Sequence, residues 1–590
     1  MTATFFQRLP YVLLAFTLSN AARGATLNST QHDPGVPTIA ASPTFTKDIA
    51  PILFHNCVRC HRQDGPVSSL PLVEYDAVAR KSKEIRDLVS RRQMPPWPAD
   101  TKHSLPFSND PSLTQTEIDT VVAWIDAGTP HGETTDLIPP PEFKQGWSNP
   151  TNRPPDAVIN LPQFNVVANG VVPYIQRLIK VPYADDRWIS ALQVRAGNPM
   201  LLHHMGITEI ALPNGVTPEV MKGFDDYARQ IGAPSGKIQV QTPAVVDPGN
   251  VGAYDMLAVF TPGTTFETYG EDNGKLLKGG GNLYINFNIH YTTTGRPDTD
   301  RTQLALWFSP HAPKHVLYRT PAAVNSIIAN GRELLSDDPG TKAEGTEYAL
   351  PPILANTKDY ELIGLGAYER AVTIYQLQPH AHVRARNFKY VVVYPDGRET
   401  TLLSVPEYSY HFQLAYQLAT PVNVPAGSKI IVTAHYNNSA GNPQLQHLGD
   451  SDSARKCGPE NVAYFGKQNQ SWDEMFSPFI QYSPGPKSQV PLHLVTAVGC
   501  LAAVSTGGWR LIKGSKPQLT DKQGTSSGEL AENSRIPLAA ERYDLLGAEV
   551  FKPGRLAELR VVVKGVLIAA PGGNRINVTS MQSAGSSCLP

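Results

Sequence analysis

Three residues near the start of the chain, Cys57, Cys60 and His61, have the spacing that attaches a c-type haem. The two thiols would form thioether bonds, and the adjacent imidazole would bind the iron. Met94, in the segment Met-Pro-Pro-Trp, is the nearby candidate for the sixth iron ligand, since a thioether there raises the reduction potential. A redox dithiol or half of a zinc site would use the same cysteines. The histidine that follows them favours one covalent haem.

Histidine and methionine residues also mark the region after residue 156 as a place for metal chemistry. The candidates are His203 and His204, His290, His380 and His382, and Met475. On a strand, residues two apart face the same side, so His380 and His382 can bind one ion together. His203 and His204 are adjacent and can do so only if the backbone turns between them. Imidazoles combined with a thioether select copper, although any one of these residues alone is more often part of a core.

The chain as a whole has the character of an exported protein. It has 590 residues, a formal net charge of -1 and no long run of like charges, which argues against nucleic-acid partners and against electrostatic binding to a membrane. A short apolar segment, 11–18, predicts a cleaved signal peptide over residues 1–24. No later stretch reaches about 18 apolar residues, so we expect no transmembrane anchor. The expected location is periplasmic or secreted.

The remaining cysteines allow little cross-linking. Cys457, Cys500 and Cys588 lie outside the haem motif, so at most one disulfide can form among them. We favour Cys500 with Cys588, and the other pairings stay open.

The elements that must position these residues change along the chain. A Thr-x-x-Glu capping box at Thr114 and helical spacing over 75–89 predict helices in the first part. Later segments such as 389–394 and 429–436 have strand character, and 52 Pro and 46 Gly supply many turns. We expect a multidomain protein with these parts: a signal peptide (1–24), a linker (25–42), a small all-α cytochrome c domain (43–133), a Pro-rich linker (134–155), two all-β sandwich domains (156–335 and 336–489) and a small OB-like β-barrel (490–590).

Two resemblances to known families add to this interpretation. The segment 45–53, Phe-Thr-Lys-Asp-Ile-Ala-Pro-Ile-Leu, and the segment 94–97 resemble those of bacterial class I-like cytochrome c modules. The order of the histidines resembles that of the copper type II, ascorbate-dependent monooxygenases, the family of peptidylglycine α-hydroxylating monooxygenase and dopamine β-monooxygenase. That resemblance implies two jelly-roll-like sandwiches with one copper each, and His203, His204 and His290 would hold the copper that transfers electrons.

The second copper would be the one that activates dioxygen. The resemblance assigns it to His380, His382 and Met475, the last in an Asp-Glu-Met triplet that the family shares. The cysteines that brace the animal enzymes are largely absent, so the substrate, a small molecule or a peptide, is not carried over. We expect plain structural roles for His411 and His435.

Together these features predict a haem- and copper-containing monooxygenase that hydroxylates a C–H bond with dioxygen. One haem would relay electrons to two separate copper sites from an external donor, either ascorbate-like or another redox protein. The main alternative is a non-catalytic electron-transfer or copper-binding cytochrome on the same scaffold. A third is a module that binds peptide or carbohydrate and has only structural histidines.

Overall fold

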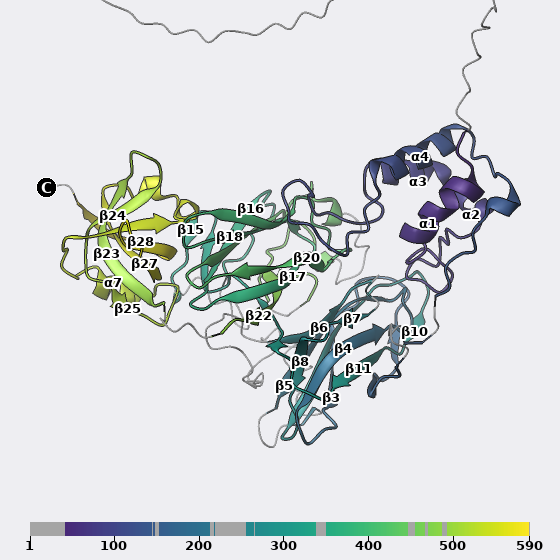
Figure 1. Cartoon of the computed structure of the whole chain (residues 1–590), viewed down its shortest axis with the longest axis horizontal. Coiled ribbons are helices and arrows are strands. Elements are labelled where there is room, and N and C mark those ends of the chain that lie inside the picture. The colour runs from purple at the N-terminus through teal and green to yellow at the C-terminus, as the bar shows by residue number, and fades with distance from the viewer. Residues whose placement is uncertain are drawn as a thin grey trace, which may run out of the picture. The chain divides into compact units, whose positions relative to one another are not determined.

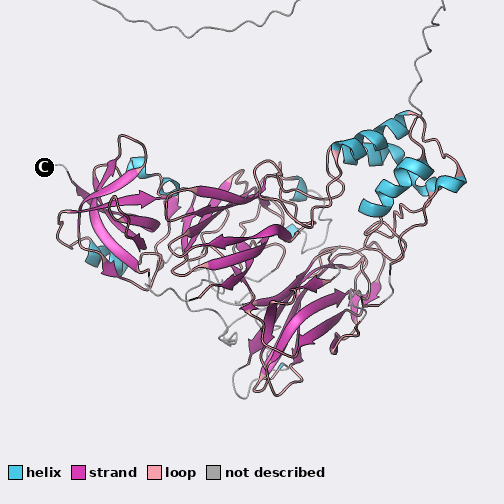
Figure 2. Cartoon of the chain, in the orientation of Figure 1, coloured by secondary structure: helices cyan, strands magenta, loops and turns pink. Residues whose placement is uncertain are grey.

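The computed structural model describes residues 42–143, 146–147, 153–212, 217–218, 255–262, 264, 266–337, 350–445, 455–466, 470–486 and 492–588 (Figure 1). The expected signal peptide (1–24) and nearly all of the expected linker (25–42) lie outside these residues. Residues 43–590 form one compact unit. Strands predominate over helices (Figure 2), which confirms the prediction of a mainly β protein. No helix within the described ranges is long and apolar enough to cross a bilayer.

The helices before residue 137, apart from the exposed turn η2, pack around one apolar core. They are the π-helical turn η1 (Phe45–Ile49), α1 (Ala50–Asn56), α2 (Tyr75–Arg80), α3 (Ser82–Ser90), α4 (Gln115–Asp126) and the 3₁₀ turn η2 (Thr134–Asp136). Helix α4 begins at the expected capping box, in which Thr114 and Glu117 each accept a hydrogen bond from the other's backbone amide. Phe45 and Trp124 are buried in this core. The expected helix over 75–89 is interrupted at Lys81.

Two sheets enclose a second core between residues 157 and 317. Their orders are β1-β11-β4-β8-β12, with β7 on β4, and β3-β9-β5-β6, while β2 pairs with β10. The strands are β1 (Ala157–Asn160), β2 (Phe164–Val166), β3 (Ile175–Lys180), β4 (Arg187–Arg195), β5 (Leu202–Ala211), β6 (Met256–Phe260), β7 (Glu267–Thr268), β8 (Asn273–Leu277), β9 (Leu283–Tyr291), β10 (Asp298–Asp300), β11 (Gln303–Ser309) and β12 (His315–Val316). Ile189 and Leu306 from one sheet share a buried cluster with Ile207 and Phe287 from the other. This is the packing of a β-sandwich.

A second pair of sheets follows, in the orders β13-β22-β17-β20 and β15-β14-β16-β21-β18-β19. The strands are β13 (Tyr318–Pro321), β14 (Ser326–Ala329), β15 (Arg332–Glu333), β16 (Tyr360–Ala367), β17 (Val372–His380), β18 (Ala385–Val393), β19 (Glu399–Val405), β20 (Tyr416–Val424), β21 (Lys429–Tyr436) and β22 (Ser477–Pro484), with a 3₁₀ turn η3 (Pro443–Leu445). Leu362 and Tyr390 pack with Leu377 and Ile480 across the two sheets. Because β13 pairs with β22, this sandwich begins ahead of residue 335, the expected end of the first one.

The last strands close into a ring. Its order is β24-β26-β28-β27-β23, and β23 pairs back onto β24, while β25 adds to β23. The elements are β23 (Leu494–Ala503), β24 (Trp509–Gly514), β25 (Gln518–Leu519), α7 (Ser527–Asn533), β26 (Glu541–Leu546), η4 (Glu549–Phe551), η5 (Pro553–Arg555), β27 (Leu559–Ile568) and β28 (Arg575–Ser587). Strands β26 and β28 run parallel. Ile363 and Ile431 of the second sandwich share a buried cluster with Val495 and Val561 of the ring.

The segment that follows Met94 leaves the helices and joins the second sandwich. Trp97 is buried in the core of that sandwich, with its ring centroid 4.8 Å from that of Tyr416. Phe107 forms a β-bridge with Leu418 on β20. Several backbone hydrogen bonds to β19 and β20 accompany this contact, including one from the Asp100 amide to the Ser404 carbonyl (2.8 Å). The loop that carries Met94 is thereby anchored on the strands of the second sandwich.

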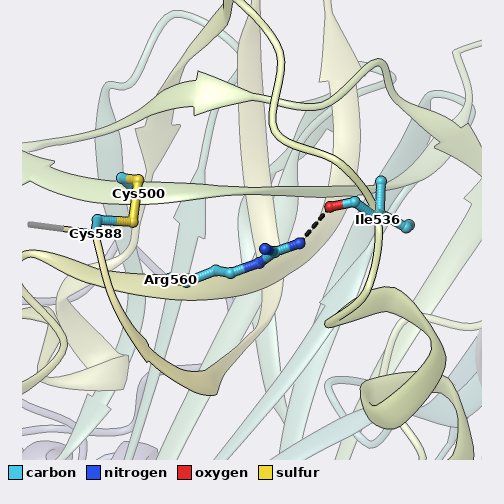
Figure 3. The surroundings of a disulfide bond; sticks show 4 residues. All are labelled: Cys500, Ile536, Arg560 and Cys588. Carbon is cyan, nitrogen blue, oxygen red and sulfur yellow. Dashed lines mark hydrogen bonds between the residues drawn. A yellow bond between two sulfur atoms is a disulfide. The ribbon is translucent and has the colours of Figure 1, made fainter. Parts of the chain in front are cut away.

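One disulfide closes the end of the chain onto the ring (Figure 3). It joins Cys500 on β23 to Cys588 just after β28, as we favoured from the sequence. Nearby, Arg560 of β27 donates a hydrogen bond to the carbonyl of Ile536. Cys457 is buried and takes no part in a disulfide.

Replacing both disulfide cysteines, Cys500→Ser with Cys588→Ser, should destabilise the ring by about 2–5 kcal/mol, because the bridge closes a loop of 88 residues in the unfolded chain. Amide hydrogen exchange in β23 and β28 measures this loss. The wild-type protein under a strong reductant is the matched control and should exchange like the double variant. Equal protection of the oxidised wild type and the variant would contradict the prediction.

Candidate metal centre

A β-bulge brings the adjacent His203 and His204 to one place. Both lie on β5, and His204 stands opposite His290 on β9. The register of this pairing shifts between Leu202 and His204, which makes His203 the extra residue. In a bulge, two residues of one strand face a single residue of the partner strand. The backbone therefore allows what a regular strand forbids, two consecutive histidines directed toward one point.

The ring nitrogens of these three histidines converge. His203 Nδ1 lies 3.0 Å from His204 Nδ1 and 3.2 Å from His290 Nδ1. Nitrogen ligands at about 2.0–2.1 Å from one ion stand roughly 3.3 Å apart in a tetrahedron. All three side chains are buried, and His203 Nε2 has no hydrogen-bond partner among the described residues, as happens at functional sites. This group of three could hold a metal ion.

Burial keeps these imidazoles neutral. Desolvation and repulsion from neighbouring histidines lower the pKa of His203 to about 3. The same two effects lower the pKa of His204 and of His290 well below its ordinary value. Only a neutral imidazole has a lone pair to offer a metal. The rings are therefore in the ligating form at neutral pH.

A second group forms where β17 ends. His380 is the last residue of β17, and its Nε2 atom lies 3.2 Å from the sulfur of Met475, which stands just before β22. The Nδ1 atom of His380 lies 2.6 Å from Oε1 of the Gln413 amide. An amide oxygen only accepts, so the ring proton belongs on Nδ1. The lone pair of Nε2 then faces the sulfur, as in a metal ligand that a neighbouring group orients.

His382 belongs to the same group and is held by the segment that precedes the methionine. Its Nδ1 atom lies 3.0 Å from the carbonyl oxygen of Asp473, which sets the same tautomer as in His380. Its backbone amide donates to the carboxylate of Glu474 (2.9 Å). Glu474 also accepts from the amide of Arg384 (2.7 Å). Glu474 of the Asp-Glu-Met triplet therefore fixes the turn on which His382 sits.

The two groups lie against each other and make up what we call the His–Met cluster: His203, His204, His290, His380, His382 and Met475. The ring centroids of His204 and His380 are 5.7 Å apart. The hydroxyl of Tyr174 lies 2.9 Å from His204 Nε2 and 3.3 Å from His382 Nε2, so it bridges the groups. The structure brings all six residues together and places the two groups in contact, closer than we expected for sites held in separate sandwiches.

Access to the His–Met cluster is uneven. His203, His204, His290 and His382 are buried, and the side chain of His382 is completely enclosed. His380 and Met475 are only partly buried. The thioether therefore belongs to the less buried part of the cluster.

Sequence reasoning missed three buried residues that support the cluster. These are Tyr174, Tyr410 and Gln413. The Tyr410 hydroxyl lies 3.1 Å from His290 Nδ1 and 3.0 Å from the Ser471 hydroxyl. No motif or spacing marks these residues, because each reaches the cluster only through the packing of strands distant in sequence.

The two histidines expected to be structural lie in different places. His411 is exposed, and its ring centroid is 5.9 Å from that of His203, so it lies at the rim of the cluster. His435, on β21, pairs with the carboxylate of Asp359 (2.8 Å).

The residues of the haem motif lie in a tight turn after α1. The carbonyl of Cys57 accepts hydrogen bonds from the amides of Cys60 (3.1 Å) and His61 (2.9 Å). The His61 ring donates from Nδ1 to the carbonyl of Leu70 (3.1 Å). Burial lowers the pKa of His61, which favours the neutral ring. Its Nε2 atom thus keeps a lone pair for a metal.

A cavity of about 560 Å³ adjoins this turn, and Cys57, Cys60, His61 and Met94 all line it. Many of its other walls are apolar side chains, such as Leu53. Burial and the neighbouring Cys60 raise the pKa of Cys57 to about 12, whereas redox-active thiols have lowered pKa values. Among the described residues, no group of three potential ligands includes these cysteines. The size and apolar lining of the cavity suit a haem. The raised pKa of Cys57 disfavours a redox dithiol, and the lack of a third ligand near the two cysteines in the described part of the chain disfavours a zinc site.

Comparisons with known proteins leave the family open. No protein-family model and no curated protein matches the chain. Among solved structures, one titled "Structure of PNGF-II in P21 space group" is 10% identical, with a TM-score of 0.19, over 55% of this chain and 65% of that chain. The match thus spans just under two thirds of that chain. A likeness this weak carries no argument about function.

Replacing a member of the histidine triad should remove one metal ion and leave the haem motif untouched. His290→Ala deletes a buried ligand, so we expect bound copper to fall by one ion per chain, as measured by elemental analysis after dialysis. His435→Ala is the matched control, because His435 pairs with an acidic side chain outside the cluster. Unchanged metal content in His290→Ala would contradict the assignment.

Proposed function

We propose that the protein is an exported, haem- and copper-containing monooxygenase that hydroxylates a C–H bond with dioxygen. The observation that carries the proposal is the pair formed by His380 and Met475, two partly buried residues whose Nε2 and Sδ atoms lie 3.2 Å apart beside the buried histidine triad. When bound, copper at these positions would supply one-electron chemistry with dioxygen, and haem would store and pass electrons. The residues supply binding, orientation and controlled access.

The ligand chemistry favours copper. A thioether is a soft ligand and, with imidazoles, suits the reduced state of copper, whereas carboxylates and carbonyls suit magnesium and calcium. The His–Met cluster contains no carboxylate ligand, and its neighbouring Glu474 is taken up by backbone amides. The outer partners Gln413 and the Asp473 carbonyl hold His380 and His382 in one tautomer. Such partners orient a ligand before the metal arrives.

Partial exposure distinguishes a catalytic role from simple electron storage. A storage site needs no entrance, whereas a hydroxylating site must admit dioxygen and a substrate. The two members that solvent reaches are His380 and Met475, the thioether side of the cluster. The histidine triad is enclosed, which suits a site that only passes electrons. This difference supports the division of labour that the family resemblance implies.

The segment 412–415 supports an electron relay from the haem. Phe412 and Leu414 line the cavity that also contains the haem motif. Gln413, between them, is buried and contacts His380 (2.6 Å). One short segment thus touches the haem cavity on one side and the His–Met cluster on the other. This segment therefore forms part of the wall between the cavity and His380.

Export and the accessory parts are consistent with the proposal. The Cys500–Cys588 disulfide is of the kind that forms in oxidising compartments, where c-type haem is also attached. The helices around the haem motif support a cytochrome c domain, and the strand order of the C-terminal ring, with its parallel β26–β28 pair, supports an OB-like barrel. A periplasmic or secreted location follows for the proposed enzyme, with an ascorbate-like or protein donor supplying electrons from outside.

Met475→Leu should separate oxygen chemistry from haem binding. Leucine keeps the apolar volume but lacks the sulfur, so we expect the protein reduced anaerobically with ascorbate to be reoxidised by dioxygen at least about 100-fold more slowly. Haem absorption after rapid mixing with dioxygen measures the rate. Met581→Leu, buried in the C-terminal ring, is the matched control and should react like the wild type.

The other outcomes separate the rival functions. One haem and two coppers per chain, with fast reoxidation that depends on Met475, support the monooxygenase. Tightly bound copper and haem without any reaction with dioxygen would point to an electron-transfer protein. Absence of bound copper after periplasmic maturation with added copper would overturn the proposal in favour of a binding module.

A further inference from the structure

Arg319 is a buried cation whose hydrogen bonds are incomplete. It lies on β13 and is 1% exposed. Its Nη2 atom donates to Glu267 (2.6 Å) and to the side-chain oxygen of Gln376 (3.0 Å). Its Nε and Nη1 atoms are buried and have no partner within the described part of the chain. Buried donors are almost always paired in folded proteins, so these two atoms call for an acceptor.

The local charges do not supply that acceptor. Besides Glu267, the carboxylate that acts on the charge of Arg319 is Asp255, and both of its oxygens lie within 3.2 Å of the buried amine of Lys275. Asp255 also accepts from the backbone amide of Arg319, not from its guanidinium. Tyr269, the other titratable neighbour, is buried with a raised pKa, because of desolvation and the charge of Glu267. The free side of the guanidinium is therefore left for a group from elsewhere.

Arg319 lines the same cavity as the haem motif and Met94, although its Nε and Nη1 atoms are themselves covered. Glu267, Gln376, Gln417 and Asn109 line it too. The side-chain amide of Gln376 donates to the side-chain oxygen of Gln417 (3.2 Å), and the backbone amide of Gln417 donates to the side-chain oxygen of Asn109 (2.9 Å). These residues give an otherwise largely apolar cavity one continuous polar wall.

The chemistry of haem matches this wall. A haem held through its two vinyl-derived thioethers keeps two propionate carboxylates on another edge of the ring. Because Cys57 and Cys60 fix one edge in the turn after α1, the carboxylates must lie elsewhere in the cavity. Guanidinium donors bind carboxylates strongly, and most strongly where water is excluded. Amide side chains such as those of Gln376 and Asn109 can complete the hydrogen bonding.

We infer that Arg319 of the second sandwich, with the polar wall around Gln376, is the binding site for a haem propionate. The cofactor is attached covalently to the helices and held electrostatically by the sandwich. The inference rests on the haem part of the proposed function and is independent of copper and of oxygen chemistry. A propionate in contact with Arg319 would also fix the distance between the haem edge and the strands that carry the His–Met cluster.

The competing cation is Arg59, which lines the cavity from the helical side and is exposed. If Arg59 were the propionate partner, the second sandwich would line the cavity without pairing with a haem carboxylate. The two arginines differ in burial, so removal of the buried one should have the larger electrostatic effect.

The experiment uses full-length protein matured in a periplasm, with potentiometric titration of the haem spectrum. Removal of a positive charge beside the haem favours the ferric state. Arg319→Gln should therefore raise the ferric-to-ferrous ratio at a fixed ambient potential about tenfold, a lowering of about 59 mV for a one-electron couple. Arg59→Gln and Arg398→Gln are the controls and should shift this ratio much less. Arg398 is an exposed cation on the second sandwich, stacked on the Tyr394 ring (4.0 Å).

Each outcome decides one question. Covalent haem in Arg319→Gln with a wild-type potential overturns the inference but leaves the haem assignment intact, and a shift confined to Arg59→Gln overturns it in favour of the helical side. Absence of covalent haem from the wild type defeats the proposed function itself.

If Arg319→Gln does not mature, Arg319→Lys keeps the charge but loses the planar donors. Its potential should then fall by a smaller amount, and a wild-type value there also overturns the inference.

Discussion

The candidate metal centre of this chain depends on one extra residue in strand β5. Without the bulge at His203, the side chains of His203 and His204 would leave opposite faces of the sheet, and only one of them could meet His290. With it, three neutral imidazoles converge in a buried space. The burial that excludes water also lowers their pKa values, so the same packing that positions the rings keeps them unprotonated. The bulge at His203 thus places the imidazole rings in a buried space, and that burial keeps them neutral.

The sequence carried the local features of the fold well. The capping box at Thr114 predicted the start of α4, and the segment 429–436 is strand β21 to the residue. Alternation along a strand predicted that His380 and His382 can act together; their ring centroids are indeed 5.5 Å apart, but His382 lies beyond the end of β17, so strand alternation is not what brings them together. The break at Lys81 was not foreseen, because helical periodicity on both sides of it is uninterrupted in the sequence. Local signals therefore predicted the start of α4 and the bounds of β21, but not the break between α2 and α3.

What the sequence could not predict comes from contacts between distant strands. Tyr174 reaches both halves of the His–Met cluster, and Gln413 orients His380, yet neither residue has a signature apart from its place in the folded chain. The bulge at His203 depends on the partner strand β9 and has no marker such as glycine at that position. The close approach of the two groups likewise depends on how two sandwiches pack, which no periodicity encodes. These contacts depend on tertiary structure, which no local signal in the sequence encodes.

The route of the chain after Met94 has a consequence for how the protein can be divided. Trp97 is part of the core of the second sandwich, and the residues up to Asn109 bond to β19 and β20 before the chain returns to form α4. The helical part is therefore interrupted in sequence by a stretch that belongs structurally to a strand region hundreds of residues later. The helical part cannot be excised as one continuous segment without removing the Trp97 side chain from the core of the second sandwich. The helical part and the second sandwich therefore have to be kept together in any truncated or recombined form of the protein.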